Sequence, residues 1–496
     1  MVQLFERNNK QQTLFAIMSN IPIAQGFVVS GDTPYGKAPQ AEAVTATHYQ
    51  QQQPYAAQPV YDATSGNRPA AQHQFQDVFW SLLFFAHLIA IVAVVAINLQ
   101  ASGMSLQQGG SYGNIVFMVS VTALSSVAMA TFALSFMMRN SQTLVQMALI
   151  FSICSSLAVG ILGFMFGNLL MGIVGLISFL FGLCYAKLVW PRIPFAAANL
   201  TTALTAVRSN LGIAIVAYLF TAVAFGWTVF WMLGLGNTLS SQNMVVVFLL
   251  FVSYYWVHQV LQNLIHVTTA GVVGTWWFVP DEASTCCSRA ISDSLFRATT
   301  YSFGSICFGS LLVAIVQALR ALEYYSRDNE DFQFLSCIVQ CILSCLESII
   351  EEINKFAYVY VGLYGFSFLE AGRNVFQLFE QKGWNVIITD DLSDNVLMMM
   401  SLAVGLASGL IGLVFGAVEP NMFVNLGMDH AAGPGFLIGL LTGFLIATVL
   451  FSVVGSAVNT VIVCFAEAPA EFQQNHPELS HEMRAAWTTA WPDLFG

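Results

Sequence analysis

The chain contains 496 residues, of which 56% are hydrophobic and only 9% are charged, and its net charge is −11. Soluble domains carry about 25% charged residues. The low charge and the mean hydropathy of +0.68 therefore exclude a soluble globular protein and predict a polytopic protein embedded in the lipid bilayer. The absence of a basic patch argues against nucleic acid as a partner.

The chain divides into three regions by composition. Residues 1–75 are rich in Gln, Pro, Ala and Tyr and offer little to bury, so we expect a disordered cytoplasmic tail. Residues 76–460 hold the long apolar runs and form the predicted transmembrane domain. Residues 461–496 are more polar and are expected to form a cytoplasmic C-terminal segment.

The apolar runs predict the membrane-spanning helices. A helix needs about 20 mostly apolar residues to cross the hydrocarbon core. Nine ranges meet this length: Val78–Asn98, Asn114–Met137, Thr143–Phe164, Asn168–Leu188, Leu211–Leu233, Met244–Thr269, Thr299–Leu319, Val396–Val418 and Gly435–Ala457.

A tenth crossing is expected within Phe332–Leu369, where the pattern is less regular. Glu351, Glu352 and Lys355 interrupt this region, and Phe356–Leu369 is too short to cross alone. We expect one part to cross the bilayer and the other to lie along its surface.

The distribution of Lys and Arg predicts which ends of the predicted helices face the cytoplasm. Cytoplasmic loops carry an excess of Lys and Arg, and with ten crossings and a cytoplasmic N-terminus most of the 16 Lys and Arg residues fall on that side. The predicted fold is therefore an all-α polytopic membrane protein with about ten transmembrane helices and both termini in the cytoplasm.

One predicted helix, in the range Ser253–Phe278, carries an unusual number of polar groups. At 100° per residue these groups gather on one side of the helix, whereas Val257, Val260 and Leu264 occupy the rest. An unsatisfied polar group in hydrocarbon costs several kcal/mol, so this polar stripe must face other helices or water. Its members are Tyr255, Gln259, Gln262, Asn263, His266 and Thr269, with His258 at its margin.

Two interpretations of the stripe stay open. Its residues could hydrogen-bond to neighbouring helices, or they could line a wet cavity, which we favour because so many share one face. Gly271 and Gly274 follow the stripe and predict a break in the helix, as in the discontinuous helices of transporters.

Aromatic residues accompany the stripe. Aromatic side chains can hold a quaternary ammonium group by cation–π attraction, and Tyr255 is the strongest candidate for such a cage, followed by Trp227 and Tyr360. Trp231, Trp276 and Trp277 lie near the ends of predicted crossings and are expected to form part of the interfacial aromatic belt.

No pattern indicates an enzyme, a metal site or a cofactor. Cys337, Cys341 and Cys345 would stack along one helical face, and a straight helix cannot wrap three such ligands around one ion. Phosphate-binding loops, metalloprotease motifs and serine-hydrolase motifs are all missing from the sequence.

Several segments resemble the choline transporter-like family, in particular its fungal and plant-type branch. The resemblance covers about the C-terminal half to two thirds of the chain. The segments that carry it are NLIHVTTAGVVGTWWF (263–278), SFGSICFGSLLVAIVQALR (302–320), NKFAYVYVGLYG (354–365), AGRNVFQLF (371–379) and CFAEAPAEFQQNHPEL (464–479).

The resemblance implies ten helices with cytoplasmic termini and transport of choline or a related amine such as ethanolamine, without ATP hydrolysis. The plasma membrane is the expected location, with an organellar membrane as the alternative. In this hypothesis Tyr255, Trp227 and Tyr360 hold the organic cation, Gln259, Gln262, Asn263 and His266 line its path, and His266 is the candidate carrier of a coupled proton. An ion channel or a non-transporting membrane scaffold is the alternative function. The oligomeric state is left undetermined.

Overall fold

The structure is a computed structural model that describes residues 74–102, 113–239, 244–325, 333–382, 388–419, 423 and 431–490. Within these residues the regular secondary structure is entirely helical, which confirms the predicted all-α membrane fold. The predicted tail lies outside the described residues except for its last two positions, and so do the side chains of Cys337, Cys341 and Cys345.

The helices follow the predicted apolar runs closely. Six stretches of the described residues are long and apolar enough to cross a membrane, and each of the nine predicted ranges falls on a helix. Ten crossings and cytoplasmic termini stay predictions. The α-helices are α2 (Val78–Ser102), α3 (Gly113–Met165), α4 (Leu169–Val189), α5 (Ile193–Ser209), α6 (Gly212–Leu239), α7 (Met244–Phe278), α8 (Arg289–Thr299), α9 (Phe303–Tyr325), α10 (Gln333–Tyr364), α11 (Phe368–Lys382), α12 (Ile388–Val418), α13 (Ala432–Glu467), α14 (Pro469–Asn475) and α15 (Pro477–Ala490).

One helix carries two predicted crossings. α3 is 53 residues long and changes direction at Asn140, whose backbone angles (φ −130°, ψ 23°) are not helical. The two arms of α3 on either side of Asn140 hold the ranges 114–137 and 143–164. A kink therefore replaces the loop that the sequence would suggest between these two crossings.

The expected break in the polar helix is wrong. α7 continues without interruption through Gly271 and Gly274 to Phe278. These two glycines instead permit close packing, because a methyl group on Gly271 would collide with Ser294 of α8 and one on Gly274 with Leu363 of α10.

The expected division of residues 332–369 is also wrong. α10 is one continuous helix of 32 residues that includes Glu351, Glu352 and Lys355. It ends at Tyr364, and the following Gly365 has φ +73°, a conformation that favours glycine. The charged residues do not end the helix, because Glu and Lys are both good helix formers.

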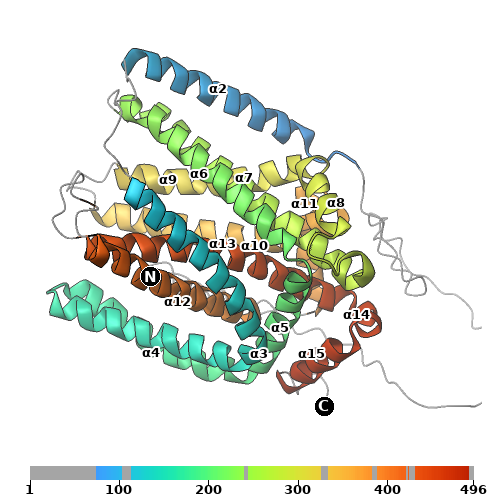
Figure 1. The fold of residues 1–496 in the computed structure, drawn as a ribbon. Coiled ribbons are helices and arrows are strands. Elements are labelled where there is room, and N and C mark those ends of the chain that lie inside the picture. The colour runs from blue at the N-terminus through green and yellow to red at the C-terminus, as the bar shows by residue number, and fades with distance from the viewer. Residues whose placement is uncertain are drawn as a thin grey trace, which may run out of the picture.

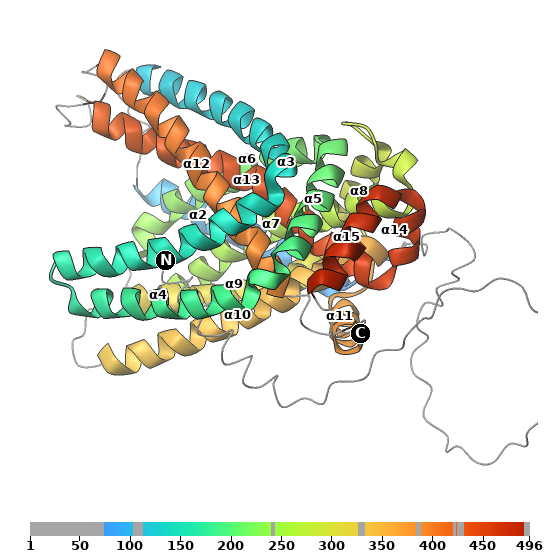
Figure 2. The ribbon, with the colours of Figure 1, turned by 90° about the horizontal axis from the view of Figure 1, so that it is seen from below.

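Most of the long helices form two groups, and α7 belongs to the first of them (Figures 1 and 2). The first helix group consists of α2, α6, α7, α9 and α10, and the second consists of α3, α4, α5, α12 and α13. They meet where α13 packs on α6, α7 and α10. In Figure 2 the ends of α12 and α13 far from α15 lie apart from that of α10, whereas the helices converge toward α5, α8 and α15. We call the end that carries α8, α14 and α15 the C-terminal end of the bundle.

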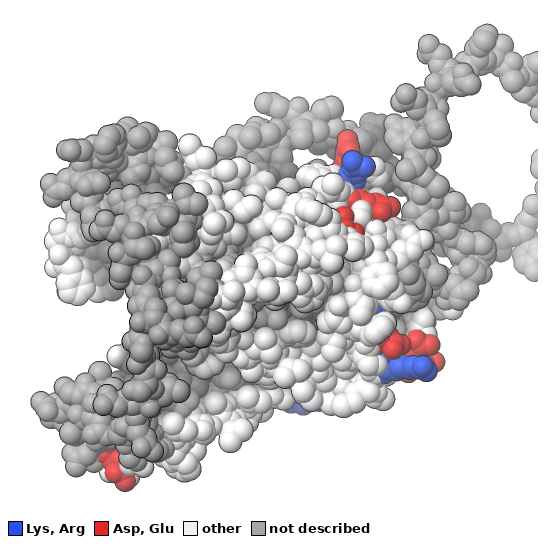
Figure 3. All heavy atoms as spheres, turned by 90° about the horizontal axis from the view of Figure 1, so that it is seen from above, with Lys and Arg blue, Asp and Glu red and all other residues white. Residues whose placement is uncertain are grey.

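The outer surface matches a protein immersed in lipid. Large apolar side chains such as Phe132, Leu170, Phe225 and Leu441 are more than half exposed. On the face shown in Figure 3, the described charged residues gather mainly at the C-terminal end and leave an uncharged band beside it. Because hydrocarbon accepts apolar surface and rejects charge, this band is the part that fits a bilayer.

Small residues bring α12 and α13 into backbone contact. Gly412 faces Gly435 so closely that a methyl group on either would collide with the carbonyl oxygen of the other. Lipid provides no hydrophobic drive between helices, so close approach supplies the dispersion contacts that hold this pair together.

Substitution of Gly412 by Ala should therefore loosen the α12–α13 contact. The added methyl meets backbone that cannot rotate away, and such overpacking typically costs about 1–3 kcal/mol. We expect a lower thermal unfolding temperature of the purified protein in detergent. Gly226→Ala on α6 is the control, because no atom lies within 4 Å of the added methyl. An unfolding temperature for Gly412→Ala equal to that of the control would contradict the packing described here.

Candidate functional site

The polar stripe on α7 faces α9 at its first two amides. The side-chain nitrogen of Gln259 donates a hydrogen bond to Gln317 (3.3 Å), and that of Asn263 donates one to the hydroxyl of Ser310 (3.0 Å). Each amide is only partly buried. These two residues therefore follow the simpler interpretation of the stripe, in which polar side chains join neighbouring helices.

His266 joins three helices at once. Its Nε2 lies 2.9 Å from the carbonyl oxygen of Lys355 on α10, and its Nδ1 lies 2.7 Å from the hydroxyl of Ser456 on α13. A carbonyl oxygen can only accept, so Nε2 carries a proton. The Ser456 hydroxyl also lies 3.0 Å from the carbonyl of Ser452, to which it can donate its one proton. It can therefore accept from a protonated Nδ1 while it donates to Ser452, or donate to an unprotonated Nδ1 instead.

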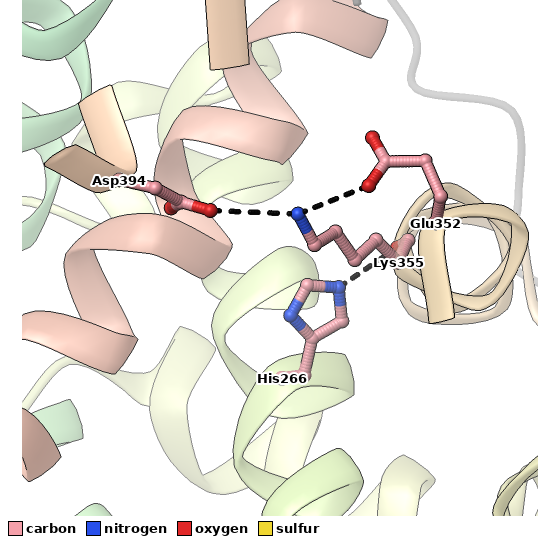
Figure 4. Close-up of polar contacts among 4 residues, drawn as sticks. All are labelled: His266, Glu352, Lys355 and Asp394. Carbon is pink, nitrogen blue, oxygen red and sulfur yellow. Dashed lines mark hydrogen bonds and ion pairs between the residues drawn. The ribbon is translucent and has the colours of Figure 1, made fainter. Parts of the chain in front are cut away.

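A group of charged side chains lies beside His266, and Figure 4 shows it with the histidine. The ammonium of Lys355 lies 3.3 Å from a carboxylate oxygen of Glu352 and 3.5 Å from one of Asp394. Glu352 and Lys355 come from α10, whereas Asp394 comes from α12. We call these three residues the ion triad.

The ion triad is partly accessible although it lies within the helix bundle. The exposed fractions of the side chains are 24% for Lys355, 30% for Asp394 and 38% for Glu352. His266 lies three residues before the end of the predicted crossing 244–269, and Asp394 lies two residues before the start of the predicted crossing 396–418. Ionisable groups within or beside apolar crossings often mark functional positions in membrane proteins.

The stripe also has an open side. Gln262 is exposed, in contrast to the paired Gln259 and Asn263. Tyr255 is half-buried and packs against Tyr254 with 5.2 Å between ring centres. Arg320 of α9 and Glu347 of α10 form an ion pair with each other.

Trp227 and Tyr360 lie apart from the ion triad in different surroundings. Trp227 packs among apolar and aromatic residues of α6 and α7, and its indole nitrogen has no hydrogen-bond partner among the described residues. The hydroxyl of Tyr360 donates to Glu467 at the end of α13, and Tyr364 donates to the same carboxylate at 2.5 Å.

The C-terminal segment covers the end of α7. The side-chain nitrogen of Asn475 donates to the carbonyls of Trp277 and Phe278, and His476 Nε2 donates to the carbonyl of Trp276. These bonds satisfy carbonyl groups that a helix end leaves without partners. The ring of His476 also stacks on Trp276, with 3.9 Å between ring centres.

The expectation that Trp231, Trp276 and Trp277 form an interfacial belt is wrong. All three are at least 94% buried. Trp277 stacks on Phe472 of α14 and donates to the carbonyl of Ala468, while Trp231 donates to the carbonyl of Leu250. α14 takes the place beside Trp276 and Trp277 that the belt interpretation assigns to lipid headgroups.

Neither a cavity nor a metal-binding group of the described residues includes the predicted site residues. A small cavity between α7, α8 and α10 is lined by Val267, Arg297, Tyr301 and Gly362 among others, and by none of the predicted site residues. Within the ranges that the structure describes, no three His, Cys, Asp or Glu side chains gather as a metal-binding group.

The ion triad is the part of the site that sequence patterns missed. Glu352 and Lys355 were visible only as an interruption of an apolar run, and Asp394 lies two residues before the predicted crossing 396–418. The signal that could have found them is the presence of ionisable residues within or beside apolar helices, which by itself suggests a functional site.

Comparison of the sequence with known proteins shows which family the chain belongs to. A family profile described as plasma-membrane choline transporter matches residues 173–470, which is more than half of the chain. The chain belongs to the choline transporter-like family. The matched region runs from α4 to α14 and includes the polar stripe, the ion triad and the end of α7.

Individual members of the choline transporter-like family show how far the likeness extends. Protein PNS1 of Gibberella zeae is 32% identical over 245 residues, which cover 48% of this chain and 44% of the relative. A CTL-like protein of Dictyostelium discoideum is 26% identical over 301 residues, covering 58% and 51%. Protein PNS1 of Eremothecium gossypii is 27% identical over 345 residues, covering 63% and 60%. The chain thus spans about half the length of the relatives it matches.

The contact between the C-terminal segment and α7 should weaken in acid. Burial lowers the pKa of His476 below its ordinary value of 6.5, although the hydrogen bond to the Trp276 carbonyl opposes this shift. The released segment therefore takes up a proton more readily than the bound one, and binding weakens as the pH falls below about 6.5. Hydrogen exchange of residues 469–490, expressed relative to the intrinsic exchange rate of an unfolded chain at the same pH, should accelerate severalfold between pH 7.5 and 5.5.

Two glutamine variants test this dependence. His476→Gln keeps a donor for the carbonyl of Trp276 but cannot be charged, so the acceleration should disappear. His481→Gln is the matched control, because His481 is exposed on α15, and it should behave like the unmodified protein. Equal acceleration in His476→Gln and the unmodified protein would show that His476 does not control this contact.

Proposed function

We propose that this member of the choline transporter-like family carries choline, or a related amine such as ethanolamine, across a membrane without ATP hydrolysis. The observation that carries the proposal is the ion triad, which holds two carboxylates and one ammonium in partial contact with solvent beside α7. Its summed charge is −1 when all three groups are ionised, and this negative charge favours the approach of an organic cation. The family match supports the choice of substrate class.

The path follows the open side of the stripe. Tyr255 and Gln262 provide a ring face and an amide oxygen, both suited to a quaternary ammonium group, and the carboxylates of Glu352 and Asp394 provide the charge. Gln259 and Asn263 border this path through their bonds to α9. Trp227 and Tyr360 are the outlying members of the proposed cation site.

The two helix groups provide the movement. Polar contacts between them include Tyr218 to the carbonyl of Ile446, His266 to Ser456, and Tyr360 to Glu467. Their helices diverge toward the opposite end, where Figure 2 shows them apart. We place the C-terminal end in the cytoplasm and the membrane at the cell surface, so that the arrangement is closed toward the cytoplasm and the carrier alternates by rearranging the contacts of α13.

His266 is the candidate for proton coupling. The bond between Nδ1 and the Ser456 hydroxyl joins the two helix groups, and a proton at Nδ1 decides whether Ser456 accepts from His266 and donates to the carbonyl of Ser452 or donates to His266. A proton and the movement of the helix groups are thereby linked through one hydrogen bond.

Uptake into proteoliposomes tests the proposal. Labelled choline and ethanolamine are offered to the full chain, and we expect saturable uptake of at least one of them. His266→Leu and Gln262→Leu should each reduce uptake about ten-fold or more, because a polar contact to a charged group is worth about 1.5–3 kcal/mol. Gln474→Leu, on the exposed surface of α14, is the matched control and should keep full activity.

Other outcomes point to other functions. Absence of uptake of both amines by folded protein would overturn the amine assignment. Preserved uptake in the two α7 variants would show that the stripe only joins helices. Currents far larger than a carrier cycle supports would indicate the ion channel alternative.

A further inference from the structure

Lys355 occupies the place in the ion triad where a substrate cation would be expected. Its ammonium lies between two carboxylates, 3.3 Å from Glu352 and 3.5 Å from Asp394, and Figure 4 shows it reaching across from α10 to α12. Two neighbouring carboxylates favour a cation between them, because its positive charge attracts both and offsets the repulsion between them. The lysine is thus a cation of the same charge as the proposed substrate.

The backbone beneath Lys355 is held independently of its side chain. His266 binds the carbonyl oxygen of Lys355, and the side chain of the preceding Asn354 donates to the carbonyl of Gly309 on α9 at 3.1 Å. The long side chain can therefore leave the carboxylates while this part of α10 stays in position. Its exposed fraction of 24% shows that solvent reaches it.

The pair between Lys355 and Asp394 also joins the two helix groups. α10 packs on α7, α9 and α11, whereas α12 packs on α13, α3 and α5. A cation that displaces the ammonium from Asp394 removes a direct connection between the groups. The substrate then connects Glu352 of α10 with Asp394 of α12 in its place, so binding and release of substrate change a contact between the two groups.

We propose that the ammonium of Lys355 is a built-in competitor of the substrate, which occupies the carboxylates of Glu352 and Asp394 in the empty carrier and is displaced when an organic cation binds. This inference rests on the proposed function. Lys355 is therefore a residue that sets affinity and release rather than one that binds substrate. A small monovalent organic cation fits the exchange, because it replaces one ammonium by another and leaves the charge of the site unchanged once Lys355 reaches solvent.

The exchange has a consequence for release. A tethered ammonium competes at the high effective concentration of a linked group, so its return to the carboxylates drives the substrate off. Removal of the ammonium should therefore strengthen binding and slow turnover together.

Equilibrium binding of labelled choline to the full chain in lipid nanodiscs tests this proposal. In Lys355→Met we expect the Kd to fall about three-fold or more, while the uptake rate in proteoliposomes decreases. Lys355→Arg keeps a cation and should stay within the range of the unmodified protein. Asp394→Asn should raise the Kd because one of the two carboxylates is lost.

A rescue experiment separates competition from a structural role. In Lys355→Ala, millimolar methylammonium supplies the missing ammonium and should weaken choline binding severalfold, with little effect on the unmodified protein. If Lys355→Met does not fold, Lys355→Met with Glu352→Gln restores the charge balance. This double variant keeps the carboxylate of Asp394 and has no competing ammonium, so it should bind choline more tightly than Glu352→Gln alone, and a further Asp394→Asn substitution should weaken its binding.

The outcomes distinguish the two proposals. Choline binding by the unmodified protein together with an unchanged or higher Kd in Lys355→Met overturns the role of Lys355 and leaves the transport function standing. Absence of choline and ethanolamine binding in folded, unmodified protein overturns the proposed function and the exchange with it.

Discussion

A charge placed within an apolar helix bundle must be matched by an opposite charge or by hydrogen bonds, because lipid offers neither. This constraint explains the ion pairs that connect helices inside the bundle. It joins Lys355 of α10 to Asp394 of α12, and Arg320 of α9 to Glu347 of α10. Each pair connects two different helices, so the requirement for charge matching also helps to fix how these helices pack.

The polar residues of α7 illustrate how one stripe can serve two purposes. Gln259, Asn263 and His266 hold neighbouring helices through their side chains, whereas Gln262 is left exposed. The two interpretations of the stripe are therefore not exclusive. A helix that lines a path in lipid must also be fixed in rotation, and the paired residues on its flank fix it.

Hydropathy predicted the helices well because each apolar run needs no partner beyond lipid to be stable. It failed where stability comes from partners distant in sequence. Lys355 of α10 pairs with Asp394 of α12, and Gly271 of α7 lies where an added methyl would collide with Ser294 of α8. Local patterns contain no information about such partners. Tyr255 and Gln262 were found because their periodicity is a property of one helix, whereas the ion triad combines two helices and could not be assembled from either alone.

The cover on the end of α7 has a consequence for how the protein is made. Trp277 donates to the carbonyl of Ala468, which is 191 residues later in the chain, and Asn475 reaches Phe278 from 197 residues away. Helices are inserted into the bilayer in the order of synthesis, so the terminal carbonyls of α7 lack these partners until residues 468–476 have been made. The end of the central helix is thus completed long after the helix itself has been synthesised.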